Sequence, residues 1–252
     1  MMAKIEWETR GAVREVRLNR PEARNALDSA MVEQLRHIFE TPPTPTERVA
    51  VIRAAGTVFC AGLDLREQAR SAEGASAIEH MLAAVEAFPL PVVAIVQGDA
   101  IAGGNELALH CDFVVASTSA RFGMSLAQIG MSTSWFLTKK IMEVAGPVAT
   151  RRILLLGDPL SSAEMHRLGV ISHLAAAAEL DATAQTVIDR LAANAPLSLK
   201  TMKALIVREM AFRDAIPHGD IDAQVEVVRT SADAAEGIAA RLAKRAPQFK
   251  GQ

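Results

Sequence analysis

The stretch Pro91–Asp112, PVVAIVQGDAIAGGNELALHCD, decides how the rest of the chain is organised. Its apolar start, PVVAIV, predicts a buried strand that ends at the following Gly-Asp turn. Gly103 and Gly104 then come just before Glu106 and an apolar run whose spacing suits a buried helix. We therefore expect a strand, a glycine turn and a helix, with Glu106 in the first helical turn.

This predicted turn combines two chemical capabilities. Paired glycines let a backbone come close to a ligand, and free N–H groups at a helix start offer hydrogen bonds to an anionic oxygen. Glu106 would stand beside such an oxygen as an acid or base. The alternative is an ordinary strand-turn-helix connection, in which the helix dipole favours Glu106 by about 0.3–1 kcal/mol. This stretch alone leaves both interpretations open.

Composition excludes several classes of protein. The 252 residues are half hydrophobic, enough for a sizeable core in one large domain or in a domain with an appendage. Tyr is absent and the formal net charge is -2, so we expect no nucleic-acid partner. There is no apolar core of signal-peptide type and no run of about 20 apolar residues, so we expect a cytoplasmic protein with no membrane partner. Cys60 and Cys111 lack metal-ligand spacing, which predicts reduced core thiols and no metal site.

The first third of the chain alternates predicted strands and helices. Residues 5–18 predict a hairpin that turns near Gly11, and Asp28 is a good N-cap for an amphipathic helix. Residues 48–53, RVAVIR, predict a second buried strand. A further amphipathic helix is predicted by the apolar positions Ile78, Met81, Leu82, Val85 and Phe88.

A second glycine loop, AAGTVFCAGLDLRE, follows the strand at 48–53. It repeats the order of the first loop: a strand, small residues with glycine, and then a polar helix start. Asp64 and Glu67 have the spacing of a helix N-cap and its reciprocal partner. Carbonyl chemistry that passes through an enolate needs two donors that converge on one oxygen, and backbone N–H groups supply them without reorganisation. Leu63 and Gly103 are the candidate donors.

The second half of the chain is mostly helical in pattern. We expect residues 1–195 to form the core and residues 196–252 a helical appendage, because no second core is visible. The apolar stripe Met202, Leu205, Ile206 and Met210 is assigned to core or subunit interface. Before it, we predict helices at 147–156 and 180–191, a capping box of Ser161 with Glu164 that opens a helix ending at Gly169, and a short strand at 170–174.

Five motifs in order carry a resemblance to a known family: NRPEARNAL, VFCAGLDL, GDAIAGGNELALHCD, SARFGMSLAQIG and EGIAARLAKRAPQF. Together they resemble the crotonase superfamily, the enoyl-CoA hydratase/isomerase family, over nearly the whole chain. The resemblance implies an α/β fold, a spiral of ββα units, with a C-terminal helical region for trimerisation. It also implies an acyl-CoA thioester whose oxygen is held by the amides of Leu63 and Gly103, and a homotrimer or dimer of trimers.

The same resemblance implies contacts to coenzyme A, which enters as part of the substrate and not as a separate cofactor. The backbone at Ala61 and Leu63 matches the segment along adenine and pantetheine, and Gly104 is placed among the substrate-binding residues. Basic side chains expected near the phosphates are Arg66 and Lys244, with Arg24 as a further candidate. The alternative for all three is an ordinary solvated surface charge.

One departure from the family pattern concerns the mechanism. The resemblance implies that hydratases of this family use two carboxylates, and Glu106 matches the first of them. The second position is held by Leu126, and the position of an acid used by isomerases and dehalogenases is held by Ser134. Isomerisation or dehalogenation by an acid in that region is therefore disfavoured, and both residues are expected to line the substrate pocket. We expect addition or loss of water by Glu106 alone, with other crotonase-type chemistry, such as isomerisation or decarboxylation, or a non-catalytic acyl-CoA binder as alternatives.

Overall fold

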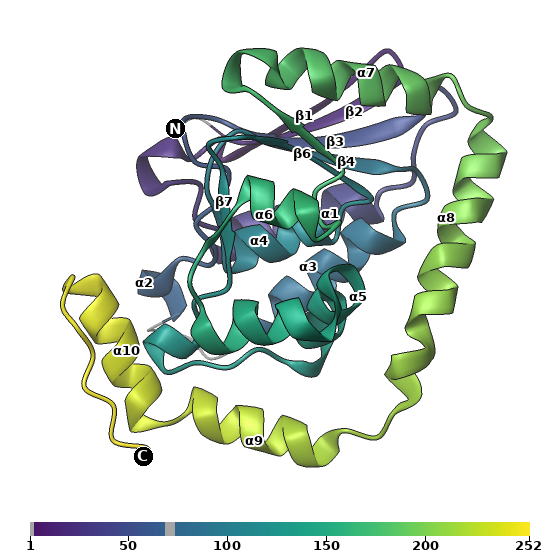
Figure 1. Ribbon diagram of the computed structural model, residues 1–252. Helices are drawn as coiled ribbons and strands as arrows, with labels where there is room; N and C mark the ends of the chain where they lie inside the picture. The colour runs from purple at the N-terminus through teal and green to yellow at the C-terminus, as the bar shows by residue number, and fades with distance from the viewer. Residues whose placement is uncertain (1–2, 69–73) are drawn as a thin grey trace.

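A computed structural model describes residues 3–68 and 74–252 of the chain (Figure 1). Its main sheet has six strands in the order β1-β2-β3-β4-β6-β9. β1 and β2 form an antiparallel hairpin, and the other neighbours run parallel. The strands are β1 (Ile5–Arg10), β2 (Val13–Leu18), β3 (Val49–Ala54), β4 (Val92–Val96), β6 (Phe113–Ser117) and β9 (His173–Ala175).

Both faces of this sheet are covered, which explains its continuous apolar strands. Along β4, Val92, Ala94 and Val96 belong to the larger core cluster, and Val93 and Ile95 belong to a second cluster. The second cluster is completed by α7 (Leu180–Ala192), which lies across the top of the sheet in Figure 1. The larger cluster lies between the sheet and the helices beneath it, where the candidate site is found.

The helices under the sheet are α1 (Ser29–Glu40), α2 (Leu65–Gln68), α3 (Gly74–Ala87), α4 (Gly103–Leu109), α5 (Trp135–Arg151) and α6 (Ser162–Arg167). A smaller sheet joins β5 (Ala100–Ile101), β7 (Arg121–Gly123) and β8 (Leu160–Ser161). α4 is the central helix, since every one of its residues is buried. This arrangement is the mixed α/β architecture expected from the sequence.

Several local predictions are confirmed. The hairpin turns at Gly11, and the Asp28 carboxylate caps α1 by accepting a hydrogen bond from the Met31 amide at 3.0 Å. Ser161 and Glu164 form the full capping box at the start of α6. Both cysteines are free and buried.

The helix expected at 147–156 is present, and its last part, residues 152–156, is a π-helix. α5 also contains a segment that the sequence analysis did not predict: it begins at Trp135, where Ser134 accepts a hydrogen bond from the Leu137 amide, and Gly146, at φ 72°, breaks it before Pro147. One local prediction needs correction. The last strand, β9, starts at His173 and not at 170.

The expected reciprocal cap between Asp64 and Glu67 is also only half formed. The Asp64 carboxylate accepts a hydrogen bond from the Arg66 amide at 3.0 Å. Glu67 turns instead to Ser29, whose amide and hydroxyl donate to its carboxylate at 2.7 and 2.9 Å. The carboxylate therefore ties α2 to the start of α1.

After α7 the chain leaves the core. α8 (Pro196–Met210) runs down one side, α9 (Gly219–Arg229) crosses below, and α10 (Ala232–Leu242) lies at the far end (Figure 1). α10 packs closely on the turn at 127–130, where a Cβ on Gly237 would lie 2.1 Å from the Ile129 carbonyl oxygen. The expected division at 195/196 stays a prediction.

The apolar stripe of α8 is not part of the core. Met202, Leu205 and Ile206 are all more than half exposed in the single chain. This leaves the subunit interface as the remaining sequence-based explanation, which stays a prediction. Within the described residues, no helix combines the length and apolar character that crossing a bilayer requires.

Candidate active site

The two glycine loops predicted from the sequence lie side by side. The Ile101 amide donates a hydrogen bond to the Cys60 carbonyl at 2.9 Å, and Cys60 forms a parallel bridge with Ala100. Strand β5 therefore runs alongside the second glycine loop, which contains Cys60, and places the start of α4 next to Leu63. Gly104 is essential to this approach, since a Cβ there would lie 2.2 Å from the Cys60 carbonyl oxygen.

The direction of the Leu63 amide follows from its own peptide unit. The Gly62 carbonyl accepts a hydrogen bond from the Leu27 amide at 2.8 Å. In a trans peptide the C=O and the N–H point in opposite directions, and there is no cis peptide in the described chain. The Leu63 N–H therefore points away from Leu27, toward α4.

The Gly103 amide is fixed in the same way. The Ala102 carbonyl accepts a hydrogen bond from the Glu106 amide at 3.0 Å, so it points along α4. The Gly103 N–H consequently points out of the helix start. Ala102 holds this geometry at φ 49° and ψ -120°, a conformation that favours glycine and costs on the order of 1–3 kcal/mol for other residues.

These two N–H groups are close together and available. A Cβ placed on Gly103 would lie 3.5 Å from the Leu63 nitrogen, and one placed on Gly62 would lie 3.1 Å from the Gly103 nitrogen. Within the described residues neither amide donates a main-chain hydrogen bond. Both residues line a cavity of about 120 Å³, so the site has two donors for one oxygen.

Glu106 lines the same cavity. Its side chain is fully buried, and neither carboxyl oxygen has a hydrogen-bond partner among the described residues. Burial raises the pKa of Glu106 well above its ordinary value, against the opposing attraction of the Lys140 ammonium on α5. A buried carboxyl without a structural partner is suited to proton transfer.

His110 lies one turn further along α4, behind the cavity. Its Nδ1 lies 2.8 Å from the Glu106 carbonyl oxygen, to which it donates, and 3.8 Å from a Glu106 carboxyl oxygen. Burial, with Lys140 nearby, lowers the pKa of His110 to about 4, so the ring is neutral at physiological pH. His110 therefore does not form an ion pair with Glu106.

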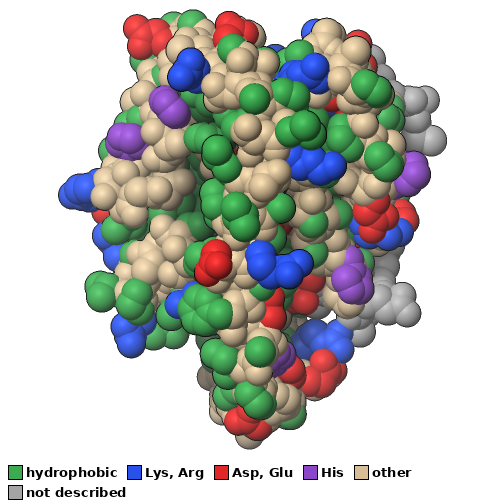
Figure 2. Space-filling model, turned by 90° about the vertical axis from the view of Figure 1, so that its right-hand side faces the viewer, with side chains coloured by type: hydrophobic (Ala, Val, Ile, Leu, Met, Phe, Trp, Pro, Cys, Tyr) green, Lys and Arg blue, Asp and Glu red, His purple; other side chains and the backbone are tan. Residues whose placement is uncertain are grey.

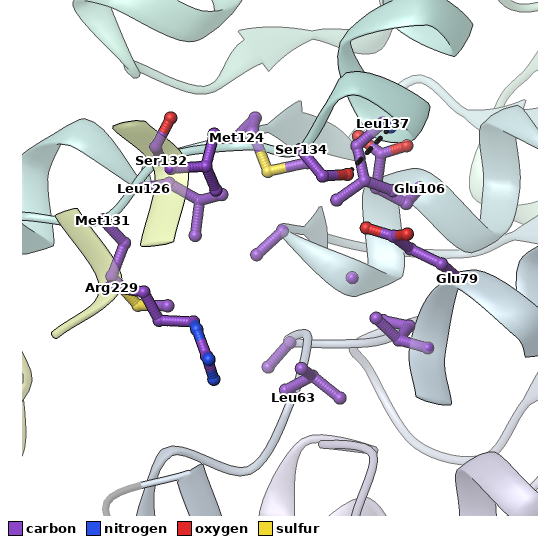
Figure 3. Close-up of a pocket in the computed structure, with 15 residues that line it drawn as sticks. Leu63, Glu79, Glu106, Met124, Leu126, Met131, Ser132, Ser134, Leu137 and Arg229 are labelled. Carbon is purple, nitrogen blue, oxygen red and sulfur yellow. Dashed lines mark hydrogen bonds between the residues drawn. The ribbon is translucent and has the colours of Figure 1, made fainter. Parts of the chain in front are cut away.

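Most of the predicted site residues line the cavity. Besides Leu63, Gly103 and Glu106, these are Ala61, Leu126 and Ser134. The Ser134 hydroxyl is engaged in capping α5 (dashed line in Figure 3). Leu126 gives the wall an apolar side chain where the family pattern suggested a carboxylate.

The other predicted residues do not line the cavity. Gly104 lies behind it, against Cys60. Arg66 on α2 and Lys244 just after α10 are exposed. Arg24 is also largely exposed, and its guanidinium lies 3.8 Å from the Asp99 carboxylate. Coenzyme A contacts of Arg24, Arg66 and Lys244 stay predictions.

The sequence analysis missed several cavity residues, among them two charged ones. Glu79 on α3 and Arg229 on α9 both line the cavity, and Figure 3 shows the Glu79 carboxyl group on the same side as Glu106. A signal was present, because Glu79 stands one helical turn before the buried Leu82 and thus on an inward-facing part of α3. The Arg229 guanidinium is held by Glu226 on its own helix at 2.7 Å.

A largely apolar cavity with two converging amides beside a buried carboxyl has the groups that an enzyme acting on a carbonyl compound needs. The sequence model of the enoyl-CoA hydratase/isomerase family matches residues 8–252. The chain belongs to this family and is an enzyme of the crotonase superfamily.

Known relatives resemble the chain along nearly its full length. The enoyl-CoA isomerase/hydratase fer4 of Mycosarcoma maydis is 32% identical over 253 residues, covering 93% of this chain and 91% of the relative. The 2,3-dehydroadipyl-CoA hydratase of Escherichia coli is 31% identical over 242 residues, covering 93% and 94%. The crystal structure of an enoyl-CoA hydratase from Mycobacterium avium subsp. paratuberculosis matches with a TM-score of 0.87 at 27% identity, covering 99% and 100%.

Proposed function

We propose that the protein is an enoyl-CoA hydratase, which adds water to or removes water from the β-carbon of an acyl-CoA thioester. The observation that carries this proposal is the convergence of the Leu63 and Gly103 amides on a cavity that also contains the unpartnered Glu106 carboxyl. The hydratase names of relatives such as the Escherichia coli protein support the choice of reaction.

In this proposal the thioester oxygen accepts hydrogen bonds from the Leu63 and Gly103 amides. As water adds to the β-carbon, negative charge grows on that oxygen, and two fixed donors stabilise it. The Glu106 carboxyl group exchanges protons with the water and the α-carbon, a contribution typically worth about 10²–10⁴-fold in rate. The apolar wall around Leu126 excludes bulk water from the forming enolate.

The direct test is Glu106→Gln, which keeps the shape of the side chain and removes its acid-base function. We expect wild-type protein to consume the conjugated double bond of crotonyl-CoA or longer enoyl-CoA thioesters, measured by ultraviolet absorbance. The variant should lose at least about 10²-fold in kcat. Glu179→Gln, at an exposed position just before α7, is the matched control and should be fully active. Equal activity of wild type and Glu106→Gln would refute the proposal.

Decarboxylation of an acyl-CoA is a second candidate, favoured by the apolar Leu126 in the wall. The two amides would stabilise the enolate left by carbon dioxide without the help of a strong base. A mass-spectrometric screen of an acyl-CoA panel separates the reactions, since hydration adds the mass of water and decarboxylation removes that of carbon dioxide. Substrate bound without any product would indicate a non-catalytic acyl-CoA binder.

We further propose that the chain assembles as a homotrimer or a dimer of trimers. Hydrophobic side chains are spread over the face that carries α8 (Figure 2), including the more than half exposed Met202, Leu205 and Ile206. An apolar row on one helix is better covered than left in water. Light scattering on the purified protein tests the assembly.

A further inference from the structure

The cavity contains a second carboxyl group, which comes from an unexpected element. Glu79 enters from α3, and Glu106 belongs to α4. Figure 3 shows both carboxyl groups facing the same cavity, on the side where Leu137 lies. The chain therefore has two acids at its site, although Leu126 and Ser134 occupy the positions where the family pattern suggested the second one.

Nothing in the described structure gives Glu79 a purely structural role. Within the described residues it forms no hydrogen bond and no ion pair. Glu86, two turns further along α3 on the same side, behaves differently, since it pairs with the Lys140 ammonium. A partly buried carboxylate that faces a cavity and has no ion-pair partner among the described residues costs stability, and such a cost is typical of residues that serve function.

The negative charge of Glu79 also acts on Glu106. The negative charge of Glu79 adds to burial in raising the pKa of Glu106, and only the Lys140 ammonium acts in the opposite direction. Two carboxyl groups at one site do not both ionise readily, so their repulsion favours a state in which one of them keeps its proton. Glu106 is fully buried and Glu79 is partly exposed, so burial leaves the shared proton on Glu106.

We infer that Glu79 is the second proton-transferring group of this site and works with Glu106 as a carboxyl pair that shares one proton. The inference deepens the proposed hydratase function and rests on it. It removes the need for one carboxyl group to shuttle both protons of the reaction.

The reaction balances with this pair alone. The ionised carboxylate takes a proton from water while the oxygen of that water bonds to the β-carbon. The electron pair of the double bond moves into the enolate, whose oxygen is held by the Leu63 and Gly103 amides. The protonated carboxyl then gives its proton to the α-carbon. The pair ends with one proton, now on the other carboxyl group, and transfer between the two groups restores the starting state.

The test compares Glu79→Gln, Glu79→Asp and Glu106→Gln with the exposed control Glu179→Gln. With an enoyl-CoA substrate, we expect Glu79→Gln to lose about 10²–10⁴-fold in kcat with little change in KM. Glu79→Asp should recover part of that loss. The double variant Glu79→Gln/Glu106→Gln should be little worse than Glu106→Gln, because groups that act as a unit are not additive.

The second readout does not require turnover. Infrared spectroscopy detects the C=O stretch of the protonated Glu106 carboxyl, and Glu106→Gln identifies that band by its loss. Removing the Glu79 charge should shift the titration of the band to lower pH. Other charged or titratable groups near Glu106 are the same in both proteins: Lys140 on α5, His110 at the end of α4, and Arg229 on α9, which lines the same cavity.

The outcomes separate the inference from the function on which it rests. Wild-type kcat and an unshifted Glu106 titration in Glu79→Gln would overturn the inference, and the hydratase proposal would stand if Glu106→Gln is inactive. Full activity of Glu106→Gln, or no hydration of any enoyl-CoA by wild type, would overturn the hydratase proposal itself. In that case Glu79 would also lose its assignment to this reaction.

Discussion

The Nδ1–H of His110 donates a hydrogen bond to the Glu106 carbonyl, one helical turn earlier, at 2.8 Å. The ring also stacks on Phe136 of α5, with the two planes 14° apart. His110 thus links α4, which carries Glu106, to α5. The ring is neutral there, because burial lowers the pKa of His110 to about 4.

Because His110 is neutral in the folded chain, we predict that the protein loses stability in mild acid. Its pKa is about 4 in the folded chain and about 6.5 when exposed, so the unfolded chain binds the proton more tightly. Stability is therefore complete above about pH 6.5 and falls as the pH drops toward 4, by up to about 3 kcal/mol. Urea unfolding at several pH values measures the effect.

The control for this prediction must separate His110 from Glu106, whose raised pKa acts with the opposite sign. Glu106 favours folding while protonated, and its contribution is lost as the pH rises from about 4.5 through its raised pKa. The series is therefore made in Glu106→Gln. In that background, His110→Asn should remove most of the decrease in the free energy of unfolding between pH 6.5 and 4. His37→Asn, at an exposed position, should show the same decrease as the parent protein. If the free energy of unfolding of His110→Asn fell just as steeply below pH 6.5, the prediction would be contradicted.

The parts of the site predicted from sequence were local. Gly103 and Glu106 belong to one strand-turn-helix unit, and Leu63 follows an equivalent glycine, so spacing alone indicated their roles. The spiral fold and the neighbourhood of the two loops came from ordered motifs. The spacing of Glu79 from Leu82 places it on an inward-facing part of α3, but only the packing of α3 against α4 shows that it shares a cavity with Glu106. The first part of α5, residues 135–145, was missed, although the helix that follows the break at Gly146, from Pro147, was predicted.

Gly104→Ala should be strongly destabilising, although alanine normally favours a helix over glycine by about 0.5–1 kcal/mol. The added Cβ would lie 2.2 Å from the Cys60 carbonyl oxygen, and α4 is buried on all sides. Overpacking of this kind costs about 1–3 kcal/mol and would push Gly103 away from Leu63. Thermal unfolding and kcat should both fall. Gly219→Ala, which meets nothing within 4 Å at the start of α9, should leave both essentially unchanged.

Arg66→Ala should reveal the predicted coenzyme A contact. If Arg66 pairs with a phosphate of the substrate, its loss should raise KM for an enoyl-CoA several-fold and leave kcat nearly unchanged, because the contact is equal in ground and transition states. The same enoyl group on pantetheine lacks the nucleotide phosphates, so its kinetics should not respond to the variant. An equal effect on both substrates would show that Arg66 acts on the fold of α2 and not on the nucleotide.

Ile206→Glu should separate assembly from folding. Ile206 is 65% exposed in the single chain, so a charge there costs the isolated fold little. In a trimer that buries α8, the substitution would place a carboxylate without water at every subunit interface. Because burying an unpaired charge is costly, the assembly should dissociate. Light scattering should then report a monomer mass for the variant and a multiple of three chains for wild type. Leu155→Glu, 73% exposed on the π-helix, introduces the same charge away from α8. If Leu155→Glu dissociates the assembly and Ile206→Glu does not, the interface lies on the π-helix and the assignment to α8 is wrong.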